Sequence, residues 1–136
     1  MTQQTIRVVA AVIQRQGKYL VCRRPLHKRH GGLWEFPGGK VEPDESDIEA
    51  MRRELGEELG VKVIDIGLPT FMQRDGQSPF VIVFIPTIIR GDPTANEHDA
   101  LQWSAIEELV RLPLAPSDSH FVAQMRSASS LDHDSR

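Results

Sequence analysis

The chain has 136 residues, of which 40% are hydrophobic and 26% are charged, and its formal net charge is −3 at pH 7. This composition is typical of one globular domain, and the acidic balance argues against a nucleic-acid polymer as a partner. The longest apolar run, residues 80–85, is too short to cross a membrane. The single cysteine, Cys22, excludes an internal disulfide.

The N-terminal residues lack the charged-then-apolar layout of a signal peptide. Together with the lone cysteine, which suits a reducing compartment, this favours a cytoplasmic protein without a membrane partner. We expect one domain over residues 1–126 and a disordered tail over residues 127–136, because the tail has little apolar content. We expect a monomer or a homodimer.

Short apolar runs predict strands on both sides of one long helical pattern. The expected strands are residues 6–13, 18–24, 33–36, 61–66, 80–89 and 101–103. Asp75-Gly76 is a hairpin-turn dipeptide just before the fifth of them. Ser104 and Glu107 have the spacing of a capping box, so we expect a short helix there, followed by a last helix over residues 119–126. The pattern alone predicts the α+β class.

The long helical pattern covers residues 47–59, where apolar residues recur at three- and four-residue steps. These residues are Ile48, Met51, Leu55 and Leu59. Ser46 and Glu49 form a capping box at the start, and Gly60 lies where a helix stop is expected. One stripe of this helix therefore faces a core.

Carboxylates crowd the same region, because residues 42–58 hold eight acidic and two basic side chains, a net charge of −6. Glu54, Glu57 and Glu58 fall in one arc beside the apolar stripe. Glu54 and Glu58 form an i,i+4 like-charge pair, which destabilises an isolated helix. One interpretation is a solvated acidic face. The other is a cation site, and ligands that are all oxygen favour Mg²⁺ or Mn²⁺.

Cations gather in the preceding segment, residues 23–32, which holds four arginine and lysine side chains and two histidines. This segment faces either phosphate groups or solvent, and Arg23 and Arg24 are its candidates for substrate binding. Gly38 and Gly39 follow a short strand, and paired glycines allow the backbone to approach a ligand closely.

A longer pattern runs through these glycines and the helix. Its fixed positions are Gly39, Glu45, Arg53, Glu54, Leu55, Glu57, Glu58 and Gly60, at the spacing of the Nudix box. The chain therefore resembles the Nudix hydrolases, and within them the small MutT-type enzymes, from about residue 6 to residue 125. The resemblance implies an α/β/α sandwich with a mixed β-sheet between helices, a nucleotide substrate and Mg²⁺ or Mn²⁺ as cofactor.

The resemblance also implies roles for single residues. The implied metal ligands are the carboxylates of Glu54, Glu57 and Glu58 and the backbone carbonyl of Gly38. Glu45 and Arg53 would orient this set, with Arg53 bridging to Glu57 one turn further along. Glu97 lies six residues before Trp103, the spacing of a MutT loop glutamate that joins the metal site or acts on the attacking water. Glu97 is otherwise an ordinary loop carboxylate, and the sequence does not decide which glutamate is the general base.

Base recognition follows from the same resemblance. Arg24 falls on an arginine that contacts the base, and Phe36 falls on an aromatic residue near it. Asp118 falls where MutT itself has an asparagine that reads oxidised guanine. A carboxylate only accepts hydrogen bonds, so Asp118 suits an exocyclic amine or the N7–H of an 8-oxopurine, unless it only caps the last helix.

The expected reaction is hydrolysis of a nucleoside triphosphate to a monophosphate and pyrophosphate, with oxidised or modified nucleotides such as 8-oxo-dGTP as substrates. CTP and 5-substituted dCTP are the alternative substrates, favoured by Asp118. A Nudix hydrolase of ADP-ribose, dinucleoside polyphosphates or capped RNA is a further alternative. A nucleotide sensor without catalysis is the alternative from another class, although every glutamate of the box is present.

Overall fold

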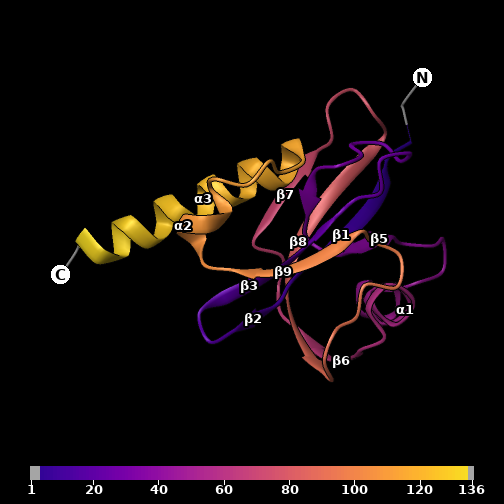
Figure 1. Cartoon of the computed structure of the whole chain (residues 1–136). Coiled ribbons are helices and arrows are strands. Elements are labelled where there is room, and N and C mark those ends of the chain that lie inside the picture. Colours follow the sequence, from indigo (N-terminus) through magenta and orange to yellow (C-terminus); the bar gives the residue numbers. More distant parts are fainter. Residues whose placement is uncertain (1–3, 135–136) are drawn as a thin grey trace.

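Two β-sheets form the centre of the computed structural model, which describes residues 4–134 (Figure 1). In the larger sheet, β1 (Ile6–Val12) and β8 (Phe80–Arg90) pair in parallel, and the outer strands pair antiparallel with them. The outer strands are β5 (Gly38–Lys40), β6 (Lys62–Ile66) and β7 (Phe71–Arg74). The smaller sheet is antiparallel and contains β2 (Gln14–Arg15), β3 (Lys18–Arg23), β4 (Trp34–Glu35) and β9 (Ala100–Ser104).

Both faces of the larger sheet are buried. Neighbouring residues of a strand point to opposite sides, and here the residues on each side belong to a core. In β1, Val9 belongs to one core and Ala10 to the other. In β8, Val83 belongs to the first core and Phe84 to the second. The run at residues 80–85 is apolar at every position because helices cover this strand on both faces. The expected layered sandwich with a mixed sheet is therefore confirmed.

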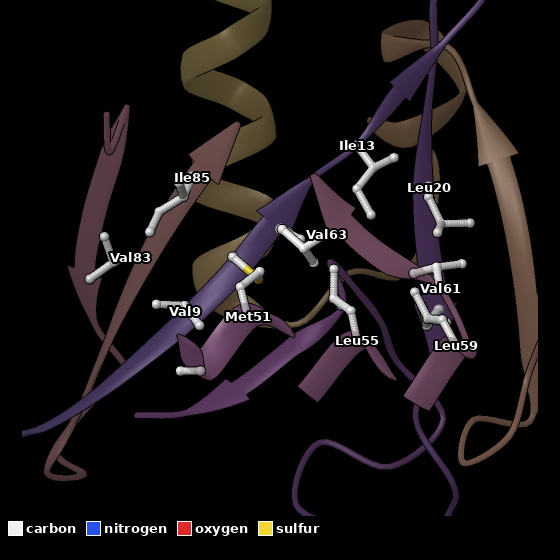
Figure 2. Close-up of a cluster of buried hydrophobic side chains, with 13 residues drawn as sticks. Val9, Ile13, Leu20, Met51, Leu55, Leu59, Val61, Val63, Val83 and Ile85 are labelled. Atoms are coloured by element: carbon white, nitrogen blue, oxygen red, sulfur yellow. The ribbon is translucent and has the colours of Figure 1, made fainter. Parts of the chain in front are cut away.

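The first face is covered by α1 (Asp47–Leu59), which begins and ends where the sequence predicts. The Ser46 hydroxyl accepts a bond from the Glu49 N–H at 3.3 Å, and the Glu49 carboxylate accepts one from the Ser46 N–H at 3.0 Å. Gly60 ends the helix with φ at 68°. The buried side chains that α1 sends into this core include Met51, Leu55 and Leu59 (Figure 2).

The second face is covered by α3 (Pro116–Asp134), with the short helix α2 (Ile106–Leu109) beside it. Phe121 of α3 stacks on Phe84 with the ring centroids 4.4 Å apart. The expected capping box of Ser104 and Glu107 is wrong. Ser104 is the buried last residue of β9, where it pairs with Tyr19, so the helix starts one residue later.

The last helix is longer than expected, since α3 starts at Pro116 and continues to Asp134. Residues 127–134 of the expected tail continue this helix, while residues 135 and 136 lie outside the described part of the chain. No glycine or proline follows Pro116 within this helix, so nothing in the sequence stops it. Its end extends away from the sheets in Figure 1, and among the described helices none is both long and apolar enough to cross a membrane.

Candidate active site

A cavity of about 460 Å³ lies among α1, the first turn of α3 and the cationic segment. Glu54 and Glu58 of α1 and Glu97 of the loop before β9 line it, together with Arg24 and Asp118. β5 lines the cavity and is followed by α1, which places Glu54 and Glu58 on the cavity wall. The size is that of a small-molecule site, and the wall carries charges of both signs.

Glu58 is a strongly perturbed carboxylate of the cavity. Burial raises its pKa to about 9, and the charges of Glu54, Glu35 and Glu97 act in the same direction. The backbone N–H of Gly38 donates to Glu58 Oε2 at 3.2 Å, which opposes the rise. Burial also raises the pKa of Glu54. Buried Glu58 and partly buried Glu54 therefore share one wall, in surroundings that disfavour their charged forms.

Arg53 links two of the carboxylates of this region, Glu45 and Glu54. Its Nε and Nη2 donate to Glu45 at 2.7 and 2.8 Å, and its Nη1 donates to Glu54 at 2.8 Å. These bonds lower the pKa of Glu45 to about 2 and raise the pKa of Arg53. The expected bridge from Arg53 to Glu57 is wrong, because a helical side chain leans toward the helix N-terminus, which leads it to Glu45.

Of the box glutamates, Glu45 and Glu57 do not line the cavity, and the side chain of Glu57 is exposed. Gly39 lies against Glu54 so closely that a Cβ there would come within 2.6 Å of both carboxylate oxygens. At Gly38 a Cβ would collide with the carbonyl oxygen of Val9, and φ is 154°. Both glycines are therefore required by close contacts, one with a side chain of the site and one with the backbone of β1.

The carboxylates fit a hard divalent cation by their chemistry. Within residues 4–134 no group of three or more His, Cys, Asp or Glu side chains is already arranged as a metal site. Burial nevertheless raises the pKa values of Glu54 and Glu58, and both groups offer only oxygen ligands. A bound cation would remove the repulsion that now favours a proton on Glu58.

The opposite layer contributes a second polar group to the wall. Asp118, in the first turn of α3, accepts a 2.8 Å bond from the backbone N–H of Phe36. Burial and the charge of Glu35 raise the pKa of Asp118 well above its usual range. The neighbouring Ser117 is buried, and its hydroxyl has no hydrogen-bond partner. Phe36, Asp118 and Ser117 therefore meet at one wall.

Arg24 reaches the cavity, but it is already engaged. Its Nη1 donates to the Glu35 carboxylate at 3.0 and 3.1 Å. Arg23, the last residue of β3, does not line the cavity, whereas Arg24, the residue after the strand, does. Its guanidinium lies 5.8 Å from the centroid of the Trp34 ring. The structure therefore does not support the expected substrate contact of Arg23.

The cationic segment covers part of the cavity rather than projecting into solvent. Lys28, Arg29 and His30 line the wall. Buried Asp75 fixes the segment, with Arg29 Nε and His30 Nε2 each 3.2 Å from its Oδ2. Of the two interpretations of this segment, its position favours the one in which it faces the substrate.

Three residues of the site carried no recognised signal in the sequence. Glu35 on the wall lies 3.1 Å from His98, although 63 positions separate them. Ser117 lines the wall beside Asp118. The pairing of β3 with both β4 and β9 makes the first contact possible, and a single sequence does not reveal such pairings.

Comparison with known proteins gives consistent results. Residues 3–125 match the model of the NUDIX domain. The chain is 44% identical over 116 residues to the CTP pyrophosphohydrolase of Escherichia coli K12, covering 83% of this chain and 85% of that protein. It is 41% identical over 76 residues to the 8-oxo-dGTP diphosphatase of Proteus vulgaris, covering 55% and 68%. The solution structure of the E. coli ORF135 protein matches with a TM-score of 0.80 and 39% identity, covering 95% and 94%.

Proposed function

The chain belongs to the Nudix hydrolase family, and from this premise we propose that it is a Mg²⁺-dependent nucleoside triphosphate pyrophosphohydrolase. Its reaction would convert a triphosphate and water to a monophosphate and pyrophosphate. Oxidised or modified nucleotides such as 8-oxo-dGTP would be its substrates. The observation that supports this most is that one cavity holds Glu54 and Glu58 from one layer and Asp118 from the other.

The acidic wall is the reaction centre in this proposal. Glu54, Glu58 and the backbone carbonyl of Gly38 would hold the cation, with Glu57 reaching it from the exposed side. When bound, a divalent cation neutralises phosphate oxygens and lowers the pKa of a ligated water. Arg53 keeps Glu54 in place through its 2.8 Å bond and is itself fixed by Glu45. Glu97 lines the same cavity and would accept a proton from the attacking water.

The second wall would read the base. A neutral Asp118 can donate a proton from the oxygen that Phe36 leaves free, so it can bind a carbonyl such as O6 of 8-oxoguanine. The unpartnered Ser117 hydroxyl, buried in the same turn, offers a further donor and acceptor. The raised pKa of Asp118 is what supports a carbonyl-bearing base.

CTP and 5-substituted dCTP are the second candidate substrates. They are favoured by the relative that is 44% identical and is named a CTP pyrophosphohydrolase. A cytosine amine would pair with the ionised form of Asp118, whereas a guanine carbonyl would pair with the neutral form. The protonation state of one residue therefore distinguishes the two candidates.

A pyrophosphate-release assay over a nucleotide panel tests the proposal. We expect turnover with Mg²⁺ or Mn²⁺, complete loss with chelator, and the highest kcat/KM for a modified or cytidine triphosphate. The variant Glu54→Gln/Glu58→Gln, checked for folding by its melting temperature, should be inactive. No pyrophosphate from any triphosphate, or equal turnover in chelator, would refute the proposed reaction.

A further inference from the structure

Glu97 is exposed, yet the loop that carries it is fixed on its N-terminal side. The backbone N–H of Asn96 donates to the Glu58 carbonyl at 3.0 Å, and its side-chain amide donates to the Glu57 carbonyl at 3.4 Å. The N–H of Thr94 donates to the Leu59 carbonyl at 3.0 Å. The loop therefore supplies donors to the last carbonyls of α1, which a helix leaves without partners.

On the C-terminal side of Glu97 the anchor is a buried imidazole. The His98 side chain is 5% exposed, and its Nε2 lies 3.1 Å from Glu35 Oε2 and 3.9 Å from Glu58 Oε1. Glu35 also accepts from Arg24 Nη1 at 3.0 Å. One continuous set of contacts thus joins Arg24, on the base side of the cavity, to Glu58, on the acidic side.

The imidazole is not fully satisfied by this arrangement. Because Nε2 faces carboxylate oxygens, it carries the proton and donates. Nδ1 is also buried, and it has no hydrogen-bond partner. An unmade bond of this kind costs about 1–3 kcal/mol, and buried histidines in stable cores are usually bonded at both nitrogens. Packing alone therefore does not account for a histidine at this position.

We propose that His98 is a positioning residue, which holds Glu97 at the mouth of the cavity by fixing the loop to Glu35 and Glu58. This inference rests on the proposed function, because it gives Glu97 its role there. Glu97 lies between Asn96 and His98, so its backbone is held from both sides while its carboxylate stays free. His98 acts through Glu97 and does not touch the substrate.

His98→Ala and His98→Gln test the proposal, with His120→Ala as the matched control. His120 is an exposed histidine on α3 and lies outside the cavity. We expect His98→Ala to lower kcat about tenfold or more with a smaller change in KM, since displacement by about 1 Å can cost 10²-fold. His98→Gln keeps a donor for Glu35, so it should recover part of the loss, and His120→Ala should leave kcat unchanged.

A double mutant shows whether His98 acts through Glu97. In a Glu97→Gln background, adding His98→Ala should cause less than about a twofold further loss, because the residue it positions is already disabled. Losses that multiply, or a kcat for His98→Ala within twofold of the wild type, would overturn the proposal.

Hydrogen exchange gives a readout that does not depend on activity. The backbone N–H of Asn96 donates to the backbone carbonyl of Glu58. We expect this N–H to exchange about tenfold faster in His98→Ala, while the backbone amides of β1 and β8 keep their rates. Unchanged exchange at Asn96 would overturn the proposal even if the wild type hydrolysed nucleotides. A wild type without hydrolysis but with the expected exchange would refute the proposed function and leave the positioning role intact.

Discussion

The backbone N–H of Phe36 donates a 2.8 Å hydrogen bond to the Asp118 carboxylate, across 82 positions of the sequence. This bond fixes the first turn of α3 to the segment that leads into Gly38 and Gly39. It occupies one carboxylate oxygen, and the residue still lines the cavity. Asp118 is therefore tied to another element of the fold as well as placed to meet a substrate, which a helix cap alone would not require.

Asp118→Asn should change which base is preferred. The pKa of Asp118 is raised by burial, so the wild type keeps its donor to a higher pH than an ordinary carboxyl group and loses it as pH rises further. Turnover of 8-oxo-dGTP should therefore fall relative to CTP with rising pH, and the two are compared at pH 6.5 and 8.5. The amide that the substitution introduces donates at both pH values, so this change should disappear in the variant. We expect the ratio of kcat/KM for 8-oxo-dGTP over CTP to rise roughly 5- to 150-fold at the higher pH, equivalent to about 1–3 kcal/mol.

The check is kcat/KM for both nucleotides in both proteins at both pH values. The side-chain oxygen of the Asp118→Asn variant can still accept from Phe36, so its melting temperature should stay near that of the wild type. A ratio that is the same in both proteins would mean that Asp118 does not contact the base.

Gly39→Ala and Gly38→Ala should fail for different reasons. The new Cβ at position 39 meets the end of the Glu54 side chain, which can move, so we expect a small change in stability and a loss of kcat of about 10²-fold or more. The Cβ at position 38 meets the backbone carbonyl of Val9, which cannot move without disturbing β1, so Gly38→Ala should unfold at a clearly lower temperature.

Gly56→Ala is the control for both glycine variants. Gly56 lies within α1 with nothing within 4 Å of an added Cβ, so alanine should stabilise the protein by about 0.5–1 kcal/mol and leave kcat unchanged. Thermal unfolding and steady-state kinetics measure all three variants. Full activity in Gly39→Ala would contradict the close contact with Glu54.

Local signals explain which parts of the structure the sequence predicts. The bounds of α1, its capping box and its Gly60 stop all follow from residues within a few positions of one another. The acidic wall follows for the same reason, because Glu54 and Glu58 share a helix face. Arg53 turns to Glu45 rather than Glu57, a choice that depends on side-chain direction rather than on spacing.

Contacts between distant segments explain what the sequence does not predict. Glu35 meets His98 only because β3 pairs with both β4 and β9. Ser104 has the right neighbour for a helix cap, but sheet pairing with Tyr19 takes precedence over the local signal. The end of α3 shows the reverse case, since a segment with little apolar content continues a helix that nothing interrupts.

Removal of residues 127–136 should have little effect on stability. Residues 127–129 are exposed on the extension of α3, so we expect the melting temperature to change by a degree or two, less than the 2–4 °C or more that a loss of about 1 kcal/mol causes in a domain of this size. A longer truncation after Gln124 is the comparison. It also removes Met125, which packs on the second core, and should lower the melting temperature further. A drop of about ten degrees for the shorter truncation would show that the end of α3 docks on the fold or on another chain.

Glu58 should make the metal-free protein less stable as pH rises. Its pKa is about 9 in the folded protein against an ordinary value of 4.5, so between these values the folded protein holds a proton that the unfolded chain releases. The free energy of unfolding then falls with rising pH, by at most about 1.4 kcal/mol per pH unit for one proton. Glu58→Gln removes this proton, so the variant should lose less stability than the wild type between pH 6 and 8.5.

A divalent cation should reverse the loss of stability that Glu58 causes at high pH in the wild type. The variant Glu58→Gln should not respond to the cation. At pH 8.5 Mg²⁺ or Mn²⁺ should raise the melting temperature of the wild type, because the cation replaces the proton on the buried carboxylates, and chelator should restore the lower value. Glu58→Gln should be more stable than the metal-free wild type at this pH, nearly insensitive to the cation and inactive in the pyrophosphate assay. The measurement is thermal unfolding of both proteins at pH 6 and 8.5, with metal and with chelator. An identical pH slope in the two proteins would show that Glu58 does not hold the raised pKa, since Asp118 and every other titrating group are common to both.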